Sequence, residues 1–431
     1  MRLRFIAVAG CVGALAFGVA ACGDDDDNGG GGGGASTGSA TASGGGGETV
    51  KIYSSLPLQG ASKDQTAAMV QGIELALEEA GGKAGDVTVE YESLDDSTAQ
   101  AGNWDPGQTA QNARKVAQDD KAIGYIGEFN SGASAISIPI INEAGVPQVS
   151  PANTYVGLTT DEPGSEQGEP AKYYPTGNRT YLRIVPRDTI QSAALLTQMK
   201  EDGCTKVAIA NDKETYGAGL ARLMEIQAKD IGVDIASNEG IDKAAANFRS
   251  FAADMKSQGA DCFVFAGVTA NGAVQIFKDV AAALPDAKLY GPDGVCESGF
   301  TNPSKGGIPK SIAPRFKCSV ATLDLQSYPG GQEFLDAFSA KYGSENPDPY
   351  AIYGYEAMKL FLDTLAGLGD KATDRQAVLQ ALFDTKDRDS VLGTYSFDEN
   401  GDTTLTSYGI YEVGDDGNPV FASAVEAQGA Q

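Results

Sequence analysis

Two short polar loops hold side chains that could together bind a carboxylate. Ser131 follows an apolar run at 123–126, and Ser-Pro-Ala-Asn-Thr at 150–154 follows a second apolar run. The order of run, loop, helix-like segment, turn, run and loop predicts a βαβ unit, whose loops leave the carboxyl ends of neighbouring parallel strands. Ser131 would then lie at the amino end of a helix, where free N–H groups attract anions. Ordinary helix capping by Ser and Asn is the alternative interpretation of this local pattern.

The composition argues against catalysis. The chain contains no His, which removes the commonest general base, the commonest metal ligand and any Ser-His-Asp triad. A hydrolase using Ser131 or Ser150 would need a lysine base, and neither loop carries one. The Asp95-Asp96 pair could in principle bind a metal, but such acids are also typical of a solvated, helix-capping loop. We therefore predict a protein that is not an enzyme and needs no metal or cofactor.

Length and charge limit the partners and the number of domains. The 431 residues include 58 acidic and 32 basic side chains, giving a formal charge of −26. So acidic a surface disfavours nucleic acid and anionic lipid as partners. The folded part is longer than one hydrophobic core usually supports, which predicts two domains.

The first residues predict export. Arg2 and Arg4 precede an apolar run that is too short and too rich in Ala and Gly for a membrane-spanning helix, so residues 1–21 are expected to be a signal peptide. The run ends in Val-Ala-Ala-Cys, which resembles a bacterial lipobox with Cys22 as the lipidated residue; a plain secretory signal with a chance Cys is the alternative. Residues 22–47 are rich in Gly, Ser and Asp and predict a flexible tether. We expect a lipid-anchored protein on the outer face of the cytoplasmic membrane.

Four further cysteines predict disulfides. An even number of cysteines in an exported protein is typical of disulfide bonding, and four of them allow three pairings. Cys204 and Cys262 each precede an apolar run that could form adjacent parallel strands, so we favour this pair. Cys296 and Cys318 then pair by elimination.

Strand-like and helix-like segments alternate along the rest of the chain. They form two blocks, about 50–185 and 190–323, separated near Arg187-Asp188, and this pattern predicts two Rossmann-like α/β lobes. Residues 155–180 form a Pro/Gly-rich insert without periodicity. Residues 393–397 and 404–413 are expected to pair as strands around the turn Asp-Glu-Asn-Gly-Asp.

The arrangement of motifs resembles one family over almost the whole folded chain. Residues 48–415 resemble the branched-chain amino-acid-binding proteins, which are type I periplasmic binding proteins and the solute receptors of ABC importers. The matching motifs are PLQG at 57–60, IGEFNSGAS at 126–134, VSPANT at 149–154, NDKETYGAGLA at 211–221, GID at 240–242, FVFAG at 263–267, YGPDGV at 290–295 and LGTYSFDENGD at 392–402.

The resemblance implies two parallel-sheet lobes joined by a hinge of three crossovers. Lobe 1 would comprise 48–187 and 324–400, and lobe 2 would comprise 188–323 and 401–431. An amino acid would bind between the lobes and be delivered to a membrane permease that a membrane-associated ATPase drives. A monomer is expected. Alternatives are a sensory module that presents the same ligand state to a signalling receptor, a receptor for an amide or another solute, and a purely structural surface protein.

The resemblance also implies a set of binding residues. The first-lobe group would hold the α-carboxylate and part of the α-ammonium group; its members are Ser131, Ala152, Asn153 and Thr154. Tyr216 would close over the ligand from the second lobe, and Asp293 would pair with the ammonium group. The remaining candidates for the walls of the site are Phe129, Asn130, Thr269 and Tyr353. Taken alone, Asp293 between Pro and Gly is typical of a turn, and Tyr216 of a packed surface aromatic residue.

Departures from the family pattern leave the ligand's side chain open. Gln65 stands near the position where the family often has an aromatic residue, and Val268-Thr269 stand where the best-known members have Tyr. The insert 155–180 is longer than in those members. We therefore expect a branched-chain or other small or apolar amino acid, or an amide.

Overall fold

The computed structural model describes residues 47–428. The predicted signal peptide, Cys22 and all but the last residue of the predicted tether lie outside the described residues. Within them, no helix combines the length and the apolar character needed to cross a membrane.

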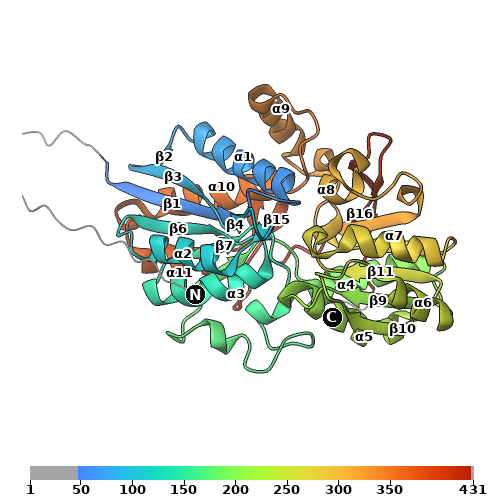
Figure 1. Ribbon diagram of the computed structural model, residues 1–431. Coiled ribbons are helices and arrows are strands. Elements are labelled where there is room, and N and C mark those ends of the chain that lie inside the picture. Colours follow the sequence, from blue (N-terminus) through green and yellow to red (C-terminus); the bar gives the residue numbers. More distant parts are fainter. Residues whose placement is uncertain (1–46, 429–431) are drawn as a thin grey trace, which may run out of the picture. The chain divides into compact units, whose positions relative to one another are not determined.

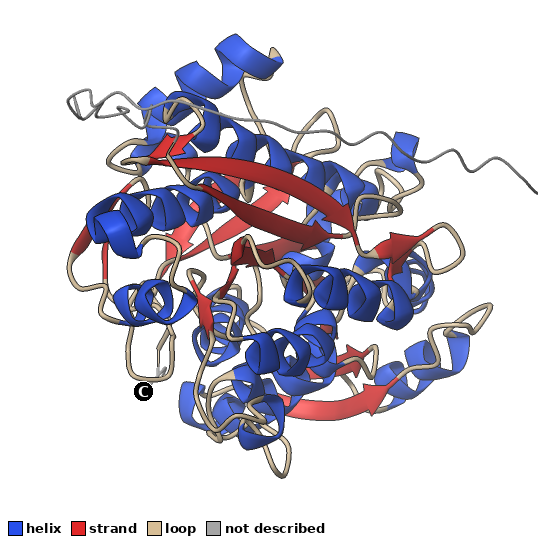
Figure 2. Ribbon diagram, turned by 90° about the vertical axis from the view of Figure 1, so that its left-hand side faces the viewer, coloured by secondary structure: helices blue, strands red, loops and turns tan. Residues whose placement is uncertain are grey.

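The first lobe is built on a six-stranded sheet. Its strands, in order across the sheet, are β2 (Lys83–Ala84), β3 (Val87–Asp95), β1 (Thr49–Leu56), β6 (Ala122–Gly127), β7 (Gln148–Ser150) and β8 (Tyr181–Arg183). All neighbours pair in parallel except β2, which forms an antiparallel hairpin with β3. Strands β6, β7 and β8 are buried along their whole length, as expected for a parallel sheet with helices on both faces. Figure 2 shows helices on both sides of the strands.

The second lobe is built on a seven-stranded sheet. Its strands, in order, are β10 (Asp234–Gly240), β9 (Lys206–Asn211), β11 (Cys262–Ala266), β12 (Lys288–Gly291), β13 (Phe316–Val320), β16 (Tyr408–Val413) and β17 (Pro419–Val425). The first five strands are parallel, and the last two join the edge of the sheet antiparallel. The two lobes and their parallel sheets confirm the predicted fold class.

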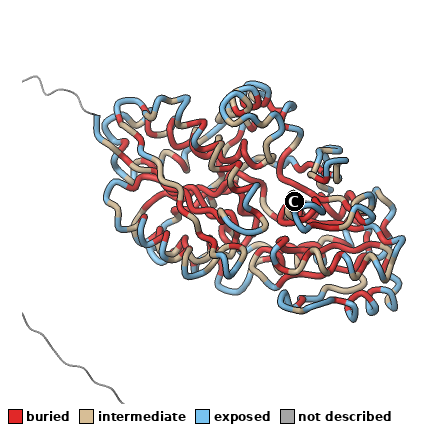
Figure 3. The backbone as a smooth tube through the Cα atoms, turned by 45° about the horizontal axis from the view of Figure 1, so that its top comes forward, coloured by how far each residue is buried: buried red, intermediate tan, exposed pale blue. Residues whose placement is uncertain are grey.

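Helices cover both sheets. Those of the first lobe are α1 (Lys63–Glu79), α2 (Pro106–Ala117), α3 (Ser131–Ala144), α10 (Ala351–Leu368) and α11 (Arg375–Phe383). Those of the second lobe are α4 (Asp188–Glu201), α5 (Thr215–Ile231), α6 (Arg249–Ser257) and α7 (Ala273–Ala283), with the short α8 (Ser298–Thr301). Helix α9 (Gly331–Tyr342) contacts α1. Figure 3 shows the buried stretches of backbone in the interior and the exposed ones at the periphery.

Helices α1 and α10 pack backbone against backbone. They are far apart in the sequence, with 271 residues between the end of α1 and the start of α10. A Cβ atom at Gly72 would collide with the carbonyl oxygen of Ala351, and one at Gly354 would collide with that of Met69. Each helix therefore needs glycine at the point of closest approach. This contact joins the beginning of the chain to its last third (Figure 1).

The chain passes between the two sheets three times, at 183–206, 320–351 and 395–408. The predicted lobe boundaries fall inside these passages, and their exact positions stay a prediction. At the first and third passages, the buried Arg183 donates from Nε to Oδ1 of Asp402 at 2.6 Å, and Arg187 donates to the other carboxylate oxygen at 3.0 Å. This ion pair ties the two passages together.

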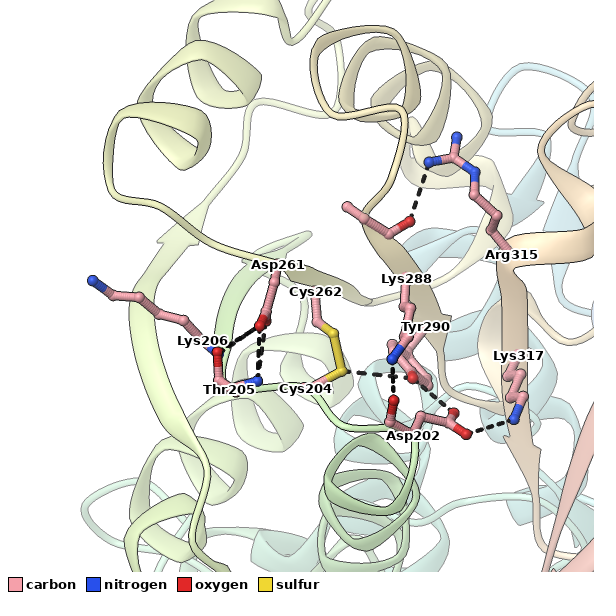
Figure 4. The surroundings of a disulfide bond; sticks show 11 residues. Asp202, Cys204, Thr205, Lys206, Asp261, Cys262, Lys288, Tyr290, Arg315 and Lys317 are labelled. Atoms are coloured by element: carbon pink, nitrogen blue, oxygen red, sulfur yellow. Dashed lines mark hydrogen bonds and ion pairs between the residues drawn. A yellow bond between two sulfur atoms is a disulfide. The ribbon is translucent and has the colours of Figure 1, made fainter.

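Both predicted disulfides are present. Cys204 bonds to Cys262, and Cys296 bonds to Cys318. The first joins the start of β11 to the loop before β9, next to Asp202, whose carboxylate accepts from Tyr290 at 2.7 Å and Lys317 at 2.8 Å (Figure 4). The disulfide therefore lies at the amino ends of the parallel strands.

The predicted strand pair near the end of the chain is wrong. Residues 393–397 and 404–413 form no ladder with each other; an isolated bridge joins Phe397 to Thr403, the residue before the second segment. Strand β15 (Gly393–Tyr395) instead forms a hairpin with β14 (Arg388–Ser390), and β16 pairs with β13 and β17. A second small hairpin joins β4 (Ser97–Thr98) and β5 (Asn103–Trp104).

Candidate functional site

A small cavity lies where loops of the two lobes meet. It measures about 20 Å³ and is lined by Phe129, Asn130, Ser131, Ala152, Thr154, Tyr216, Val268, Asp293 and Gly294. Seven of these nine residues are among the candidates from the sequence. Since this volume holds about one water molecule, we expect the walls to move apart before a whole amino acid enters.

The first-lobe wall offers hydrogen-bond donors. Ser131 is the first residue of α3, so its N–H group and that of Gly132 point out of the helix end, whereas those of Ala133 and Ser134 donate to the carbonyl oxygen of Asn130. Thr154 contributes a hydroxyl group from the loop after β7. The helix dipole of α3 adds a partial positive charge at the same place. This wall is therefore suited to a carboxylate.

A buried network fixes the shape of both first-lobe loops. The Ser150 hydroxyl donates to the carbonyl oxygen of Glu128 at 2.8 Å and accepts from the N–H groups of Ala152 and Asn153. The Asn153 side chain donates to the carbonyl oxygen of Phe129 at 2.8 Å, while its own oxygen accepts from Tyr181 at 3.0 Å. Asn153 thus cross-links the two loops, and the cavity lining does not include it.

Arg183 supports the same loop from behind. One of its terminal nitrogens donates to the carbonyl oxygens of Asn153 at 3.3 Å and Tyr155 at 2.8 Å, the residues on either side of Thr154. The ion pair between Arg183 and Asp402 therefore connects the position of Thr154 to the passages between the lobes.

The second-lobe wall is built around Asp293. This residue begins the short 3₁₀ helix η4 (Asp293–Val295) after β12 and is 8% exposed. Its Oδ1 accepts from the Tyr216 hydroxyl at 2.5 Å and from the Gln191 amide at 2.6 Å, and its Oδ2 accepts from the Tyr350 hydroxyl at 2.9 Å. All three donors are neutral. A buried carboxylate surrounded by neutral donors is suited to a cationic ligand group.

Burial perturbs the acids around this wall. Desolvation raises the pKa of Asp293 above its usual value, while the hydrogen bonds from Tyr216, Gln191 and Tyr350 act in the opposite direction. Desolvation also raises the pKa of Asp188, which is fully buried at the start of α4 and close enough to Asp293 for the two charges to repel each other. A bound cation would relieve both effects.

Three candidates from the sequence lie outside the cavity lining. Asn153 holds the loops together, as described above. The Thr269 hydroxyl donates to the carbonyl oxygen of Gly294 at 3.3 Å, so Thr269 stands directly behind the wall. Tyr353 donates to the carbonyl oxygen of Ala321, and its ring packs 5.7 Å from that of Tyr350.

The sequence interpretation missed four residues at the site. Tyr350, rather than Tyr353, reaches Asp293, and its ring meets that of Phe129 edge to face at 6.2 Å. Gln191 carries a second hydrogen bond to Asp293. Val268 and Gly294 line the cavity. Tyr350 and Tyr353 are about one helical turn apart, so the sequence pattern could indicate either residue as part of the site. Nothing in the sequence pointed to Gln191.

The arrangement presents opposite chemistry on its two sides. N–H and hydroxyl donors lie on the first lobe, and a carboxylate lies on the second. The apolar side chains of Phe129 and Val268 also line the cavity. A small zwitterion fits this pattern because both of its charges would be matched when the lobes close on it.

Comparisons with known proteins identify the family of the chain. A sequence model of the family described as periplasmic binding protein matches residues 49–418. A Leu/Ile/Val-binding protein homolog from Brucella melitensis is 25% identical over 367 residues, covering 84% of this chain and 90% of the relative.

Two solved structures share the fold. A leucine-binding protein from Thermotoga maritima has 21% identity and a TM-score of 0.72, covering 88% of this chain and all but 1% of its own. A solute-binding protein of an ABC transporter from R. palustris, in complex with benzoate, has 20% identity and a TM-score of 0.71, covering 89% of this chain and 98% of its own.

Proposed function

Because residues 49–418 make this chain a member of the periplasmic binding protein family, we propose that it is the extracytoplasmic solute receptor of an ABC importer and captures an α-amino acid between its lobes. A branched-chain or other small or apolar amino acid is the first candidate. The observation that carries the proposal is the pairing of the donor-lined first-lobe loops with the buried Asp293 across one cavity. The family consists of binding proteins, which agrees with the prediction that the chain is not an enzyme.

The ligand's two charges would bind to different lobes. The α-carboxylate would accept from the N–H groups at the start of α3 and from the hydroxyl groups of Ser131 and Thr154. The α-ammonium group would pair with Asp293 and share its surroundings with Tyr216. Since neither lobe holds both charges, bound ligand would favour the closed arrangement over the open one.

The names of the relatives support an amino acid more than an aromatic acid. The Brucella relative is named for leucine, isoleucine and valine, and the Thermotoga structure for leucine. The R. palustris protein holds benzoate, which has a carboxylate but no ammonium group. A ligand of that kind would leave Asp293 buried beside its neutral donors with no cation to pair with.

Delivery would take place at a membrane surface. Lipidation at Cys22 would hold the receptor there through the tether, and the closed form would dock as a monomer on a permease driven by its ATPase. Detergent partitioning tests the anchor: the wild type should enter the detergent phase and Cys22→Ala the aqueous phase. Recovery of the intact wild type in the aqueous phase would contradict the lipid anchor.

The amino-acid proposal is tested by thermal unfolding of the purified protein with each of the twenty amino acids and common amides. A ligand at a hundred times its dissociation constant adds about 2.7 kcal/mol of stability. One or a few amino acids should stabilise the wild type but not Asp293→Ala. No shift with any α-amino acid would contradict the proposal, and stabilisation by amides alone would favour the amide alternative.

A further inference from the structure

Another buried carboxylate lies close to the site, besides those of Asp293 and Asp188. Glu297 follows Asp293 by four residues, is 2% exposed, and neither of its carboxylate oxygens has a hydrogen-bond partner among the described residues. A buried charge without a partner destabilises a fold, so such groups are usually paired, neutralised or used in binding.

Glu297 lies between the lobes, directly behind the cavity wall. Its carboxyl group is beside Thr269 of the second lobe and Ser62 of the first. Thr269 in turn donates to the carbonyl oxygen of Gly294, which lines the cavity. One residue, Thr269, therefore separates the carboxylate from the cavity.

The first lobe adds acceptors to the same place. The Oε1 atom of Gln65 on α1 is buried without a partner, and Asp348 lies beside Gln65. Asp348 is two residues before Tyr350, the residue that donates to Asp293. Behind the cavity, Asp348 is close enough to Glu297 for its charge to raise the pKa of Glu297.

The lysine near this cluster already has an acidic partner. Lys305 lies close enough to act on Asp348, but it pairs with Asp64 at 2.5 Å on the partly exposed edge between the lobes. Burial raises the pKa of Glu297 to about 7, and that of Asp348 also to about 7. Within residues 47–428, the cluster therefore has acceptors on both lobes and no basic side chain that pairs with Glu297.

We propose that the receptor also takes α-amino acids whose side chains end in a positively charged nitrogen, with that group bound by Glu297 between Ser62, Gln65 and Asp348. The inference rests on the proposed function, because the α-carboxylate and α-ammonium groups would still be held by the first-lobe loops and Asp293. Because the cavity lining includes neither Thr269 nor Glu297, the wall would have to open at Thr269 for a long side chain such as that of lysine to reach the carboxylate.

Calorimetric titration of the purified protein at pH 8 with lysine, norleucine and leucine tests this. Norleucine matches the lysine side chain without its charge. The wild type should bind lysine at least tenfold more tightly than norleucine, and in Glu297→Gln this ratio should fall to about one. Glu345→Gln, an exposed residue of the neighbouring 344–349 segment, is the matched control and should keep the wild-type ratio.

A measurement on the wild type alone keeps the test independent of any variant's folding. Since Glu297 loses its proton near neutral pH, the preference for lysine over norleucine should grow between pH 6 and pH 8. Equal affinity of the wild type for lysine and norleucine would overturn the inference, and so would a preference for lysine that Glu297→Gln retains. In either case, binding of leucine would still support the proposed function. Failure of every α-amino acid to bind would overturn both.

Discussion

Asp293 and Glu297 are four residues apart and both buried, yet their surroundings differ. Asp293 accepts three hydrogen bonds from neutral donors, whereas Glu297 accepts none from the described residues. The Asp293 carboxylate is held in place by its three donors, whereas for Glu297 only the nearby hydroxyl groups of Thr269 and Ser62 oppose the effect of desolvation on its pKa. The difference separates a carboxylate that the protein itself holds firmly from one whose buried charge a bound cation would offset.

Removing the carboxylate of Asp293 should have the largest effect. Asp293→Ala is expected to weaken amino-acid binding by about 2–5 kcal/mol, as does the loss of one partner of a buried charge pair. Titration calorimetry with the ligand found in the thermal screen measures this. Asp293→Asn separates charge from shape and should recover little affinity. An Asp293→Ala variant that binds within threefold of the wild type would remove Asp293 from the site.

Glu297→Gln should change stability in a pH-dependent way. Because burial raises the pKa of Glu297 to about 7 from its ordinary 4.5, the folded protein keeps a proton that the unfolded chain releases between these values. Stability from this group is therefore present at pH 5 and lost as the pH rises through 7. The variant should be more stable than the wild type at pH 8, on the order of 1–3 kcal/mol, and similar at pH 5.

Urea unfolding at the two pH values measures the effect of Glu297→Gln. Glu239→Gln, at an exposed position in β10, is the matched control and should show no such difference between pH 5 and pH 8. An equal change in stability at both pH values would mean that Glu297 is not the desolvated acid described above.

Tyr350→Phe should have the smallest effect and locates the edge of the site. It removes one hydrogen bond to Asp293, which is expected to weaken ligand binding by about 0.5–1.5 kcal/mol. Tyr353→Phe is the control, since its hydroxyl donates to the Ala321 carbonyl oxygen outside the cavity and should affect stability more than affinity. The reverse order of effects would restore Tyr353, the residue predicted from the sequence, to the site.

The sequence predicted what depends on local pattern and chain order. The parallel strands β9 and β11 follow from their apolar runs, and with them the bond between Cys204 and Cys262. The loops at Ser131 and Thr154 likewise follow from the βαβ pattern. These features were accessible because a parallel strand ends in a loop at a known edge of the sheet.

What the sequence could not give depends on side chains that meet only in the folded chain. Gln191 donates to Asp293 from helix α4, 102 residues earlier in the chain. Strand β17 alternates weakly and was not predicted, and β16 was assigned to the wrong partner because local alternation does not identify the neighbouring strand. The unpaired state of Glu297 is likewise a property of the folded surroundings.

The packing of α1 against α10 also determines how the chain can fold. In the sequence, α10 of the first lobe follows all five parallel strands of the second sheet. Strands β16 and β17, which complete the second sheet, come near the end of the chain. A chain that ends at residue 340 would lack both α10 and β16. The face of α1 that contains Gly72 would then be uncovered, and β13 would lose its antiparallel partner. Each lobe therefore contains segments from the last third of the chain, so a fragment that ends before α10 lacks part of both lobes.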